Sequence, residues 1–149
     1  MDKKQIAMDA MSKKFNCAQS VFVALSDEVG VSRETALKMA ACFGGGMKCG
    51  EVCGAVTGAL MALGMKYGSC QENDLAGKQF EGQKGLEFIK KFKEKHGTIL
   101  CRELLKYHAD KPEEMKAAIQ KGHSAVCSKA VCDAVEIAED MLTAIPIKM

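Results

Sequence analysis

The sequence lacks both a membrane-spanning segment and a secretory leader. None of its apolar runs approaches the roughly 20 residues that a helix needs to cross a bilayer. The first residues, Met-Asp-Lys-Lys-Gln-Ile, contain neither the apolar stretch nor the cleavage site of a signal peptide. We therefore expect a cytoplasmic protein that does not insert into a membrane.

Proline and alternating β-branched segments are also scarce, which argues against a β-sheet protein. The chain has 2 prolines in 149 residues and is rich in Ala, Leu, Met, Lys and Glu, which favour helices. The net charge is only +2 at pH 7, so nothing indicates a nucleic-acid partner. With 48% hydrophobic residues the chain can bury a core, and we predict one all-α domain over residues 1–149.

Several cofactor motifs are missing as well. No Cys-x-x-Cys-His segment occurs, which excludes covalent attachment of a c-type haem. The spacing between Cys49 and Cys53 is not the two-residue spacing of a thioredoxin-like motif or a zinc knuckle. The glycine-rich stretch Gly44–Gly46 matches neither the P-loop nor the dinucleotide fingerprint, so no nucleotide is indicated.

The sequence predicts a bundle of about six to eight helices without an internal repeat. Capping residues, glycines and apolar spacing set the expected bounds. The expected helices are Lys3–Phe15, Cys17–Val29 after the cap Asn16, Ser32 to Ala41, Glu51–Tyr67, a helix ending at His96, Thr98 to His108, Pro112–Gly122, and Ser124 to Ala144. The polar stretch Ser69–Gly85 is expected to be a connector leading into the fifth of these helices.

The most informative feature that is present is a set of 8 cysteines. A cytoplasmic protein does not normally keep structural disulfides, so abundant cysteine there indicates metal or redox chemistry. Single cysteines also serve as small apolar core residues, which is the plainer explanation for any one of them. It does not account well for all eight.

Cys53 lies in the most distinctive stretch of the chain. Gly44, Gly45 and Gly46 predict a backbone loop, because three consecutive glycines are unfavourable inside a helix. Glu51 suits the first turn of the helix that follows, which places Cys53 near its N-terminus. Free amides and the helix dipole favour a thiolate in such a position, so we expect Cys53 to be activated.

Four cysteines share this kind of placement. Cys17 follows Asn16, Cys53 follows the glycine loop, and Cys101 and Cys127 each come three residues after an expected cap. Each also begins an apolar stripe, which predicts that its sulfur faces the protein interior. If the four helix starts converge, they would support several thiolates or a thiolate-bound metal ion.

The remaining candidates are weaker. His108 lies seven residues after Cys101 and His123 one turn before Cys127, so either is a candidate proton donor or metal ligand. His96 precedes Gly97 and is expected to be a polar residue at a helix end. Four further cysteines are given no role in the site: Cys42, Cys49, Cys70 and Cys132.

Five segments resemble the C_GCAxxG_C_C family, which is grouped as redox-active proteins. They are Asn16-Cys-Ala-Gln19, Phe43-Gly-Gly-Gly-Met47, Cys53-Gly-Ala-Val-Thr-Gly58, Cys101-Arg-Glu-Leu-Leu105 and the late Cys127. The resemblance covers nearly the whole chain. It implies a small helical protein whose four characteristic cysteines match Cys17, Cys53, Cys101 and Cys127.

Three hypotheses follow. The first is a redox protein, a thiol–disulfide oxidoreductase without a cofactor, in which Cys17, Cys53, Cys101 and Cys127 carry the chemistry with a redox partner. The alternative is a four-cysteine metal site for zinc or an iron–sulfur cluster, with His108 as a weak additional ligand. The third is an anion bound by Gly44, Gly45, Gly46 and Lys48. A homodimer is compatible with all three.

Overall fold

The computed structural model describes residues 2–108, 110–122 and 125–144, and this part of the chain contains eight α-helices and no strand. The predicted all-α bundle of six to eight helices is therefore confirmed. The helices are α1 (Lys3–Ser12), α2 (Cys17–Leu25), α3 (Arg33–Ala40), α4 (Gly54–Tyr67), α5 (Leu75–His96), α6 (Cys101–Leu104), α7 (Pro112–Gly122) and α8 (Val126–Thr143).

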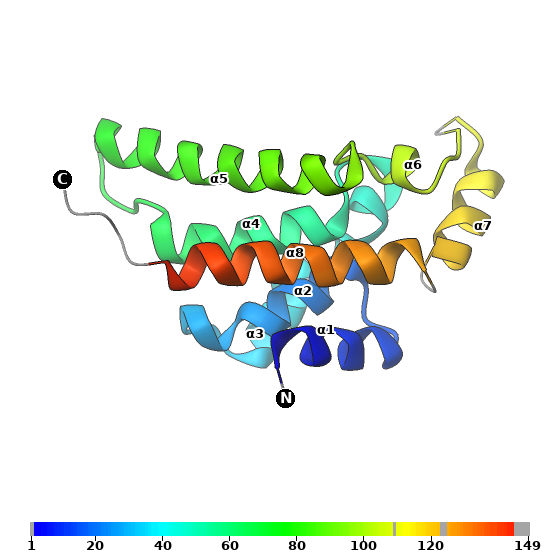
Figure 1. Cartoon of the computed structure of the whole chain (residues 1–149), viewed down its shortest axis with the longest axis horizontal. Coiled ribbons are helices and arrows are strands. Elements are labelled where there is room, and N and C mark those ends of the chain that lie inside the picture. The colour runs from blue at the N-terminus through cyan, green and yellow to red at the C-terminus, as the bar shows by residue number, and fades with distance from the viewer. Residues whose placement is uncertain (1, 109, 123–124, 145–149) are drawn as a thin grey trace.

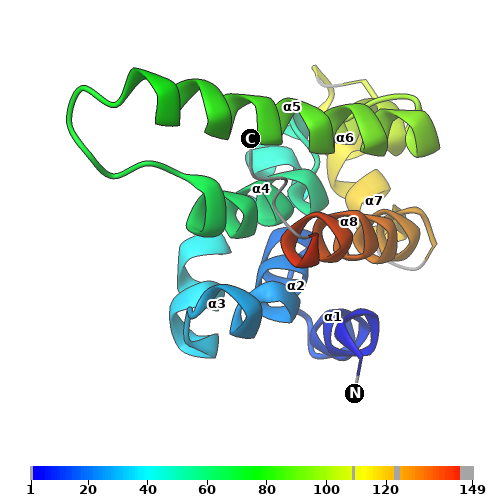
Figure 2. The same ribbon diagram turned by 60° about the vertical axis from the view of Figure 1, so that its left-hand side comes forward.

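The helices stack in three layers (Figures 1 and 2). The long helix α5 forms one outer layer, α4 and α8 lie side by side in the middle, and α1, α2 and α3 form the other outer layer. The starts of α4 and α8 lie at the same end of the bundle, beside α6 and α7 (right in Figure 1). This end gathers several N-terminal turns and positions the candidate site.

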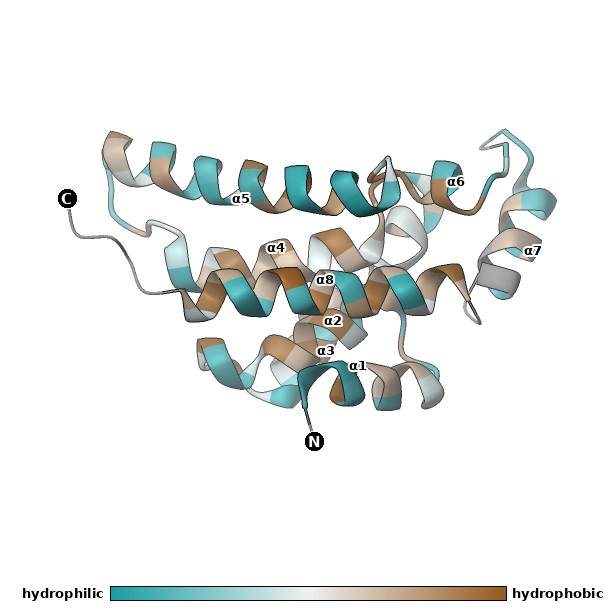
Figure 3. Ribbon diagram, viewed as in Figure 1, coloured by the Kyte–Doolittle hydropathy of each residue, from teal (hydrophilic) through white to brown (hydrophobic). Residues whose placement is uncertain are grey.

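The core lies between the layers and draws on all of the longer helices. Its largest fully buried side chains include Phe22 of α2, Leu63 of α4, Phe88 and Phe92 of α5, and Leu142 of α8. Figure 3 shows the resulting contrast between α8, whose apolar and polar bands alternate, and α5, which is polar over much of its length. Burial of one apolar face per helix is what holds such a bundle together.

Side-chain caps fix several helix starts as expected. Asn16 accepts from the Gln19 N–H at 2.9 Å while the Gln19 side chain accepts from the Asn16 N–H, which makes a capping box before α2. Ser32 accepts from the Thr35 N–H at 3.2 Å before α3. These two predicted caps are confirmed, and α7 has the predicted bounds Pro112–Gly122.

The predicted helices that correspond to α1 and α2 extended too far at their C-terminal ends. The first stops at Ser12 instead of Phe15, because Lys14 takes a left-handed conformation with φ 73°. The second stops at Leu25 instead of Val29, where a short 3₁₀ turn follows before the next loop. Both errors lie at helix ends, which sequence patterns locate less well than helix centres.

The largest error is the connector expected over Ser69–Gly85. The structure places most of it in α5, which begins at Leu75 after the cap Asp74. The Asp74 carboxylate accepts from the Gly77 N–H at 2.9 Å. The glycines that suggested a connector are tolerated because the core contacts of α5 come from Phe88 and Phe92, further along the helix.

The last predicted helix corresponds to α8, which runs to Thr143 and closely matches the expected end at Ala144. Its expected cap, Ser124, lies outside the described residues. None of the helices that the structure describes has the length and apolar character needed to cross a membrane.

Candidate functional site

All four cysteines singled out from the sequence lie at helix starts. Cys17 is the first residue of α2 and Cys101 is the first residue of α6. Cys53 immediately precedes α4, and Cys127 is the second residue of α8. The predicted first-turn positions are confirmed, although α4 begins after Cys53 rather than at Glu51, and α6 begins at Cys101 rather than after Thr98.

The four side chains converge on one buried cavity. The exposed fractions are 6% for Cys17, Cys53 and Cys101 and 9% for Cys127. All four line a single cavity of about 20 Å³, which is close to the space that one water molecule occupies. The other residues around this inner cavity are Gly54, Leu104, Leu105, Val126 and Ala130. Convergence, which the sequence left open, is thus a feature of the fold.

A short antiparallel bridge sets Cys53 beside Cys101. Val52 and Leu100 pair with each other, the Cys53 N–H donates to the Ile99 carbonyl, and a matching bond of the same length, 2.7 Å, starts at the Cys101 N–H. Side chains alternate between the two faces of extended backbone. Cys53 and Cys101 each follow a bridged residue, so both lie on the face opposite Val52 and Leu100.

Two glycines in α4 bring Cys53 close to Cys17. A Cβ atom on Gly58 would lie 2.6 Å from the carbonyl oxygen of Ala18, and one on Gly54 would lie 3.3 Å from the Cys17 Cβ. Only glycine permits this close approach of α4 to α2 without displacing one of the helices. Gly54 and Gly58 therefore permit the close contact between α2 and α4.

Cys17 has the environment of a thiolate. A hydrogen bond with Cys127, followed by those from the Gly45 N–H and its own N–H and by the charge of Lys48, lowers the pKa of the Cys17 thiol from 9.0 to about 7 against the effect of burial. The position at the start of α2 acts in the same direction, because a helix N-terminus attracts negative charge. About half of Cys17 is therefore ionised at neutral pH.

For Cys53, which was expected to be activated, the pKa shift runs in the opposite direction. Burial, followed by the nearby charge of Cys17, raises the pKa of the Cys53 thiol to about 12, and the amides of Ala55 and Val56 only partly offset this. A helix start stabilises a thiolate only when the gain exceeds the cost of removing the charge from water. Cys17 has an additional donor in Cys127 and the Lys48 charge, whereas Cys53 faces the charge of Cys17.

The other two thiols also retain their protons. The hydrogen bond with Cys17, and then burial, raises the pKa of Cys127, so Cys127 is the donor of that pair. Burial raises the pKa of Cys101, while a hydrogen bond from the Tyr107 hydroxyl, 3.7 Å from the Cys101 sulfur, acts in the opposite direction. At neutral pH the cavity therefore holds one partly ionised thiol among three protonated ones.

Tyr107 is a site residue that sequence reasoning missed, and His108 was selected in its place. A helix continuing from Cys101 would bring His108, seven residues on, back to the same face. That helix ends at Leu104, and Lys106 then reverses the chain with a φ of 56°. Tyr107 consequently turns inward with 7% of its surface exposed, and His108 is exposed and lies away from the cavity.

His108 does not line the inner cavity with the four cysteines. The backbone N–H of His108 donates to the Glu114 carboxylate at 3.2 Å, which ties this segment to α7. The second histidine candidate, His123, lies outside the described residues. His96 ends α5 as expected, and its Nε2 lies 2.9 Å from the Asp133 carboxylate.

The glycine loop turns its groups toward Cys17. Gly45, Gly46, Met47 and Lys48 all have φ between 59° and 66°, a left-handed conformation that is uncommon for residues with a side chain. The Glu51 N–H donates to the Gly46 carbonyl at 2.9 Å, and this hydrogen bond closes the loop. Inside the protein, the Gly45 N–H and the positive charge of Lys48 both favour the ionised form of Cys17.

The outer side of the same loop also borders a pocket, which we call the lysine pocket. Its volume is about 450 Å³, and Gly44, Gly45 and Lys48 line it together with Lys116 of α7. The remaining lining residues are Asn16, Pro112, Met115 and Gln120. Its described lining residues include two lysines and no acidic residue. Anion binding at Gly44–Gly46 and Lys48 stays a prediction.

The four other cysteines lie away from the inner cavity. Cys42, Cys49 and Cys70 are exposed, and the Cys49 thiol lies 3.5 Å from the Gly46 carbonyl oxygen. Cys132 is half-buried on α8, where burial raises its pKa. The expectation that these four are secondary to the main cluster agrees with their positions.

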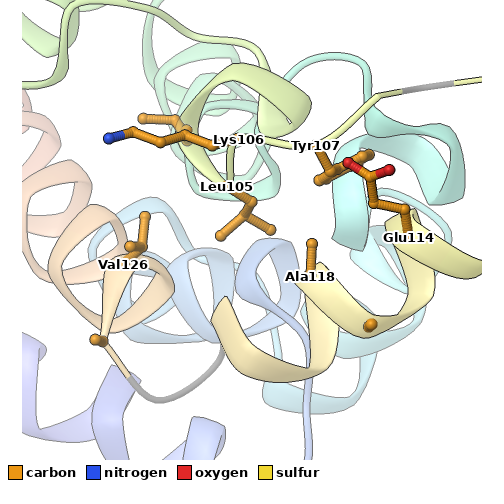
Figure 4. Close-up of a pocket in the computed structure, with 9 residues that line it drawn as sticks. Leu105, Lys106, Tyr107, Glu114, Ala118 and Val126 are labelled. Atoms are coloured by element: carbon orange, nitrogen blue, oxygen red, sulfur yellow. The ribbon is translucent and has the colours of Figure 1, made fainter.

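A larger pocket adjoins the inner cavity on its outer side. This outer pocket has a volume of about 490 Å³ and lies between α6, α7 and the start of α8. In Figure 4, Leu105 points into the space between α7 and α8, with Ala118 of α7 facing it and Val126 on the other side. Leu104, Leu105 and Val126 line both the outer pocket and the inner cavity.

The arrangement of possible ligands also bears on metal binding. Within residues 2–108, 110–122 and 125–144, no group of three or more His, Cys, Asp or Glu side chains has the arrangement of a metal-ion site. The four cysteines nevertheless line one cavity. A four-cysteine metal site stays a prediction that needs direct metal analysis.

Comparison with known families agrees with this cluster of cysteines. The family model described as "Putative redox-active protein (C_GCAxxG_C_C)" matches residues 15–141. The chain belongs to this family. Comparisons with curated proteins and with solved structures gave no significant match.

Membership in the C_GCAxxG_C_C family confirms the resemblance found in the sequence. The matched region includes Cys17, Cys53, Cys101 and Cys127, together with the glycine loop between the first two. The family description is limited to redox activity. The particular chemistry of this chain has to be argued from its own geometry.

Proposed function

We propose that this protein carries out thiol–disulfide exchange through Cys17 and Cys127. The observation that carries the proposal is that these two buried thiols line one cavity, where their interaction lowers the pKa of Cys17 to about 7 while that of Cys127 is raised. Cys17 would thus supply the nucleophile and Cys127 the proton. A thiol with a pKa near the ambient pH is also the best attacking group in such exchange.

In the first step, the Cys17 thiolate attacks one sulfur of a substrate disulfide. The Cys17–substrate bond forms as the substrate S–S bond breaks, and the electron pair leaves with the second substrate sulfur. Cys127 gives its proton to this leaving thiolate. The cavity then contains a mixed disulfide on Cys17 and a thiolate on Cys127.

In the second step, the Cys127 thiolate attacks the Cys17 sulfur. A disulfide forms between Cys17 and Cys127, and the substrate sulfur that was bound to Cys17 leaves as a thiolate and takes a proton from solvent. The substrate gains two electrons and the protein loses two. A dithiol reductant must then return the protein to its starting state.

Cys53 and Cys101 would act as a second dithiol beside the first. Their alignment by the Val52–Leu100 bridge supports this role, and burial raises the pKa of both thiols. They therefore stay protonated during the first exchange. Attack of Cys53 on the Cys17–Cys127 disulfide, followed by attack of Cys101 on Cys53, would transfer the oxidised state to a Cys53–Cys101 disulfide, and the protons of the two attacking thiols would pass to the released thiolates of Cys17 and Cys127.

The proposal is tested by the pH dependence of cysteine alkylation in the fully reduced protein. We expect iodoacetamide to modify Cys17 with a midpoint near pH 7 and the other three cavity cysteines only at higher pH, as followed by quantitative peptide mass spectrometry. In the variant C127A the Cys17 pKa should rise, and alkylation at pH 7 should slow by roughly tenfold per pKa unit.

The matched control is C132A, a change on the same helix outside the inner cavity. It should leave the midpoint of Cys17 unchanged. A midpoint of Cys17 near 9, or earlier alkylation of Cys53, would contradict the proposal.

A four-cysteine metal or iron–sulfur site is the second candidate, favoured by the fact that all four cysteines line one cavity. Tetrahedral zinc bound by four thiolates has Zn–S distances of about 2.3 Å, and clusters also use four cysteines. Anaerobic purification, metal analysis and a visible spectrum distinguish the two candidates. One bound zinc or a cluster per chain, with all four cysteines unreactive to iodoacetamide, would favour this candidate over exchange.

A further inference from the structure

We propose that the outer pocket between α6, α7 and α8 binds a small, uncharged aliphatic disulfide and presents it to Cys17 and Cys127. The inference deepens the proposed function, on which its chemical step rests. It concerns the class of substrate, which neither the four cysteines nor the family description specifies.

The outer pocket and the inner cavity adjoin each other. Leu104, Leu105 and Val126 line both the outer pocket and the inner cavity, so the two are separated by single side chains. No cysteine lines the outer pocket itself. A substrate held there lies next to the sulfurs while its body stays outside the cluster.

The second argument is the chemistry of the lining. Most of the outer pocket consists of alkyl groups from leucine, valine and alanine, among them Leu105, Ala118 and Val126 (Figure 4). Among the described residues that line it, the charged ones are Lys106 and Glu114, which carry opposite charges. Such a surface favours a hydrocarbon body and gives no net attraction to a charged disulfide.

The third argument is size. A volume of about 490 Å³ lies within the range of small-molecule sites, whereas the inner cavity of about 20 Å³ admits only a group the size of one or two atoms. A disulfide of a folded protein is flanked by two backbones and does not fit this path. A disulfide at the end of an alkyl chain does fit, because the chain fills the outer pocket while the sulfur enters between the side chains.

The lysine pocket offers the contrasting prediction. It is bordered by the glycine loop, and its described lining residues include Lys48 and Lys116 but no acidic residue. A charged disulfide such as oxidised glutathione would be drawn there. Helix α7 borders both pockets, so substitutions on its two sides separate these alternatives.

Binding is tested first without any redox step. The probe is octanamide, an aliphatic amide without sulfur, added to the reduced protein during iodoacetamide alkylation. We expect octanamide to slow Cys17 alkylation by at least about fivefold in the wild type, because it blocks the entrance. The protection should be lost in A118F, in which the added ring occupies the outer pocket.

Exchange is then tested with lipoamide, a neutral disulfide at the end of an alkyl chain. The rate at which the reduced protein forms dihydrolipoamide in one turnover, measured by mass spectrometry after acid quenching, gives the half-saturating concentration. We expect A118F to raise this concentration at least roughly tenfold. Q120F, which adds the same ring to α7 on the lysine-pocket side, should change it less than about twofold.

Two controls guard against a displaced helix. The smaller variant A118L should give an intermediate effect, and the Cys17 alkylation midpoint without octanamide should be unchanged in all three variants. A stronger effect of Q120F than of A118F, or faster exchange with oxidised glutathione or insulin than with lipoamide, would overturn the inference.

Failure of the inference and failure of the proposed function give different results. One outcome is that diamide oxidises the protein to a Cys17–Cys127 disulfide while A118F and the wild type show the same protection by octanamide and the same half-saturating concentration of lipoamide. That result would contradict only the outer-pocket inference. If octanamide protects Cys17 but no oxidant joins Cys17 to Cys127, the pocket stands and the proposed exchange falls.

Discussion

Cys17 and Cys53 both sit at the start of a helix, yet their thiol pKa values move in opposite directions. Both sulfurs are buried at a helix start, so for each thiol the helix dipole favours ionisation and burial opposes it. The difference comes from the neighbours: Cys17 accepts from Cys127 and lies near Lys48, whereas Cys53 faces Cys17. Which of these two thiols ionises more readily therefore depends on which one lies next to the donor Cys127.

The lowered pKa of Cys17 makes a prediction about stability under reducing conditions. A group whose folded pKa is about 7 and whose unfolded pKa is near 9 adds no stability well below pH 7 and its full contribution above pH 9. We expect the free energy of unfolding of the wild type to rise relative to C17S by about 2 kcal/mol between pH 7 and pH 9. Urea unfolding across this range measures the difference.

Above pH 9 the free energy of unfolding should fall in both the wild type and C17S, because both contain Cys53. Cys53 has a folded pKa of about 12, so the stability gained by keeping it neutral is lost as the pH rises beyond its unfolded value. C70S, a change at an exposed cysteine far from the cluster in sequence, should follow the wild-type curve. A pH-independent difference between wild type and C17S would contradict the assignment of the thiolate.

At the scale of helices, the contact between α2 and α4 decides whether Cys17 and Cys53 share a cavity. G58A places a methyl group 2.6 Å from the Ala18 carbonyl oxygen, so one helix must move. We expect a loss of about 2 kcal/mol in unfolding free energy. The same variant should raise the alkylation rate of Cys53, because the cavity opens.

G64A is the matched control on the same helix. A Cβ at Gly64 meets nothing within 4 Å, and the position is exposed. Alanine is the better helix former, so G64A should stabilise the protein by about 0.5–1 kcal/mol. Equal effects of the two substitutions in urea unfolding would show that close helix packing is not what Gly58 provides.

The sequence predicted the helices with strong caps and failed where tertiary contacts decide. Asn16 and Ser32 carry their capping signal locally, so the starts of α2 and α3 were found. The length of α6 was not, because Lys106 reverses the chain after four helical residues for no reason visible in the local pattern. That error led to the choice of His108 over Tyr107.

At the scale of the whole molecule, the site is an end of the bundle where helix starts from distant parts of the chain meet. The apolar stripes predicted that each of the four cysteines faces inward, and this is what the structure contains. Their convergence depends on the Val52–Leu100 bridge and on Gly54 and Gly58, which act over distances that periodicity does not encode. The outer pocket, formed by α6, α7 and α8 together, has no sequence signature at all.

The central claim is that Cys17 and Cys127 form the working pair. Its most direct test is disulfide mapping by peptide mass spectrometry after one equivalent of diamide is added to the reduced, metal-free protein. We predict that the first disulfide joins Cys17 to Cys127, that Cys53–Cys101 appears only with further oxidation, and that C17S forms neither rapidly. A first disulfide that leaves Cys17 free, or joins it to a cysteine outside the inner cavity, would contradict the account.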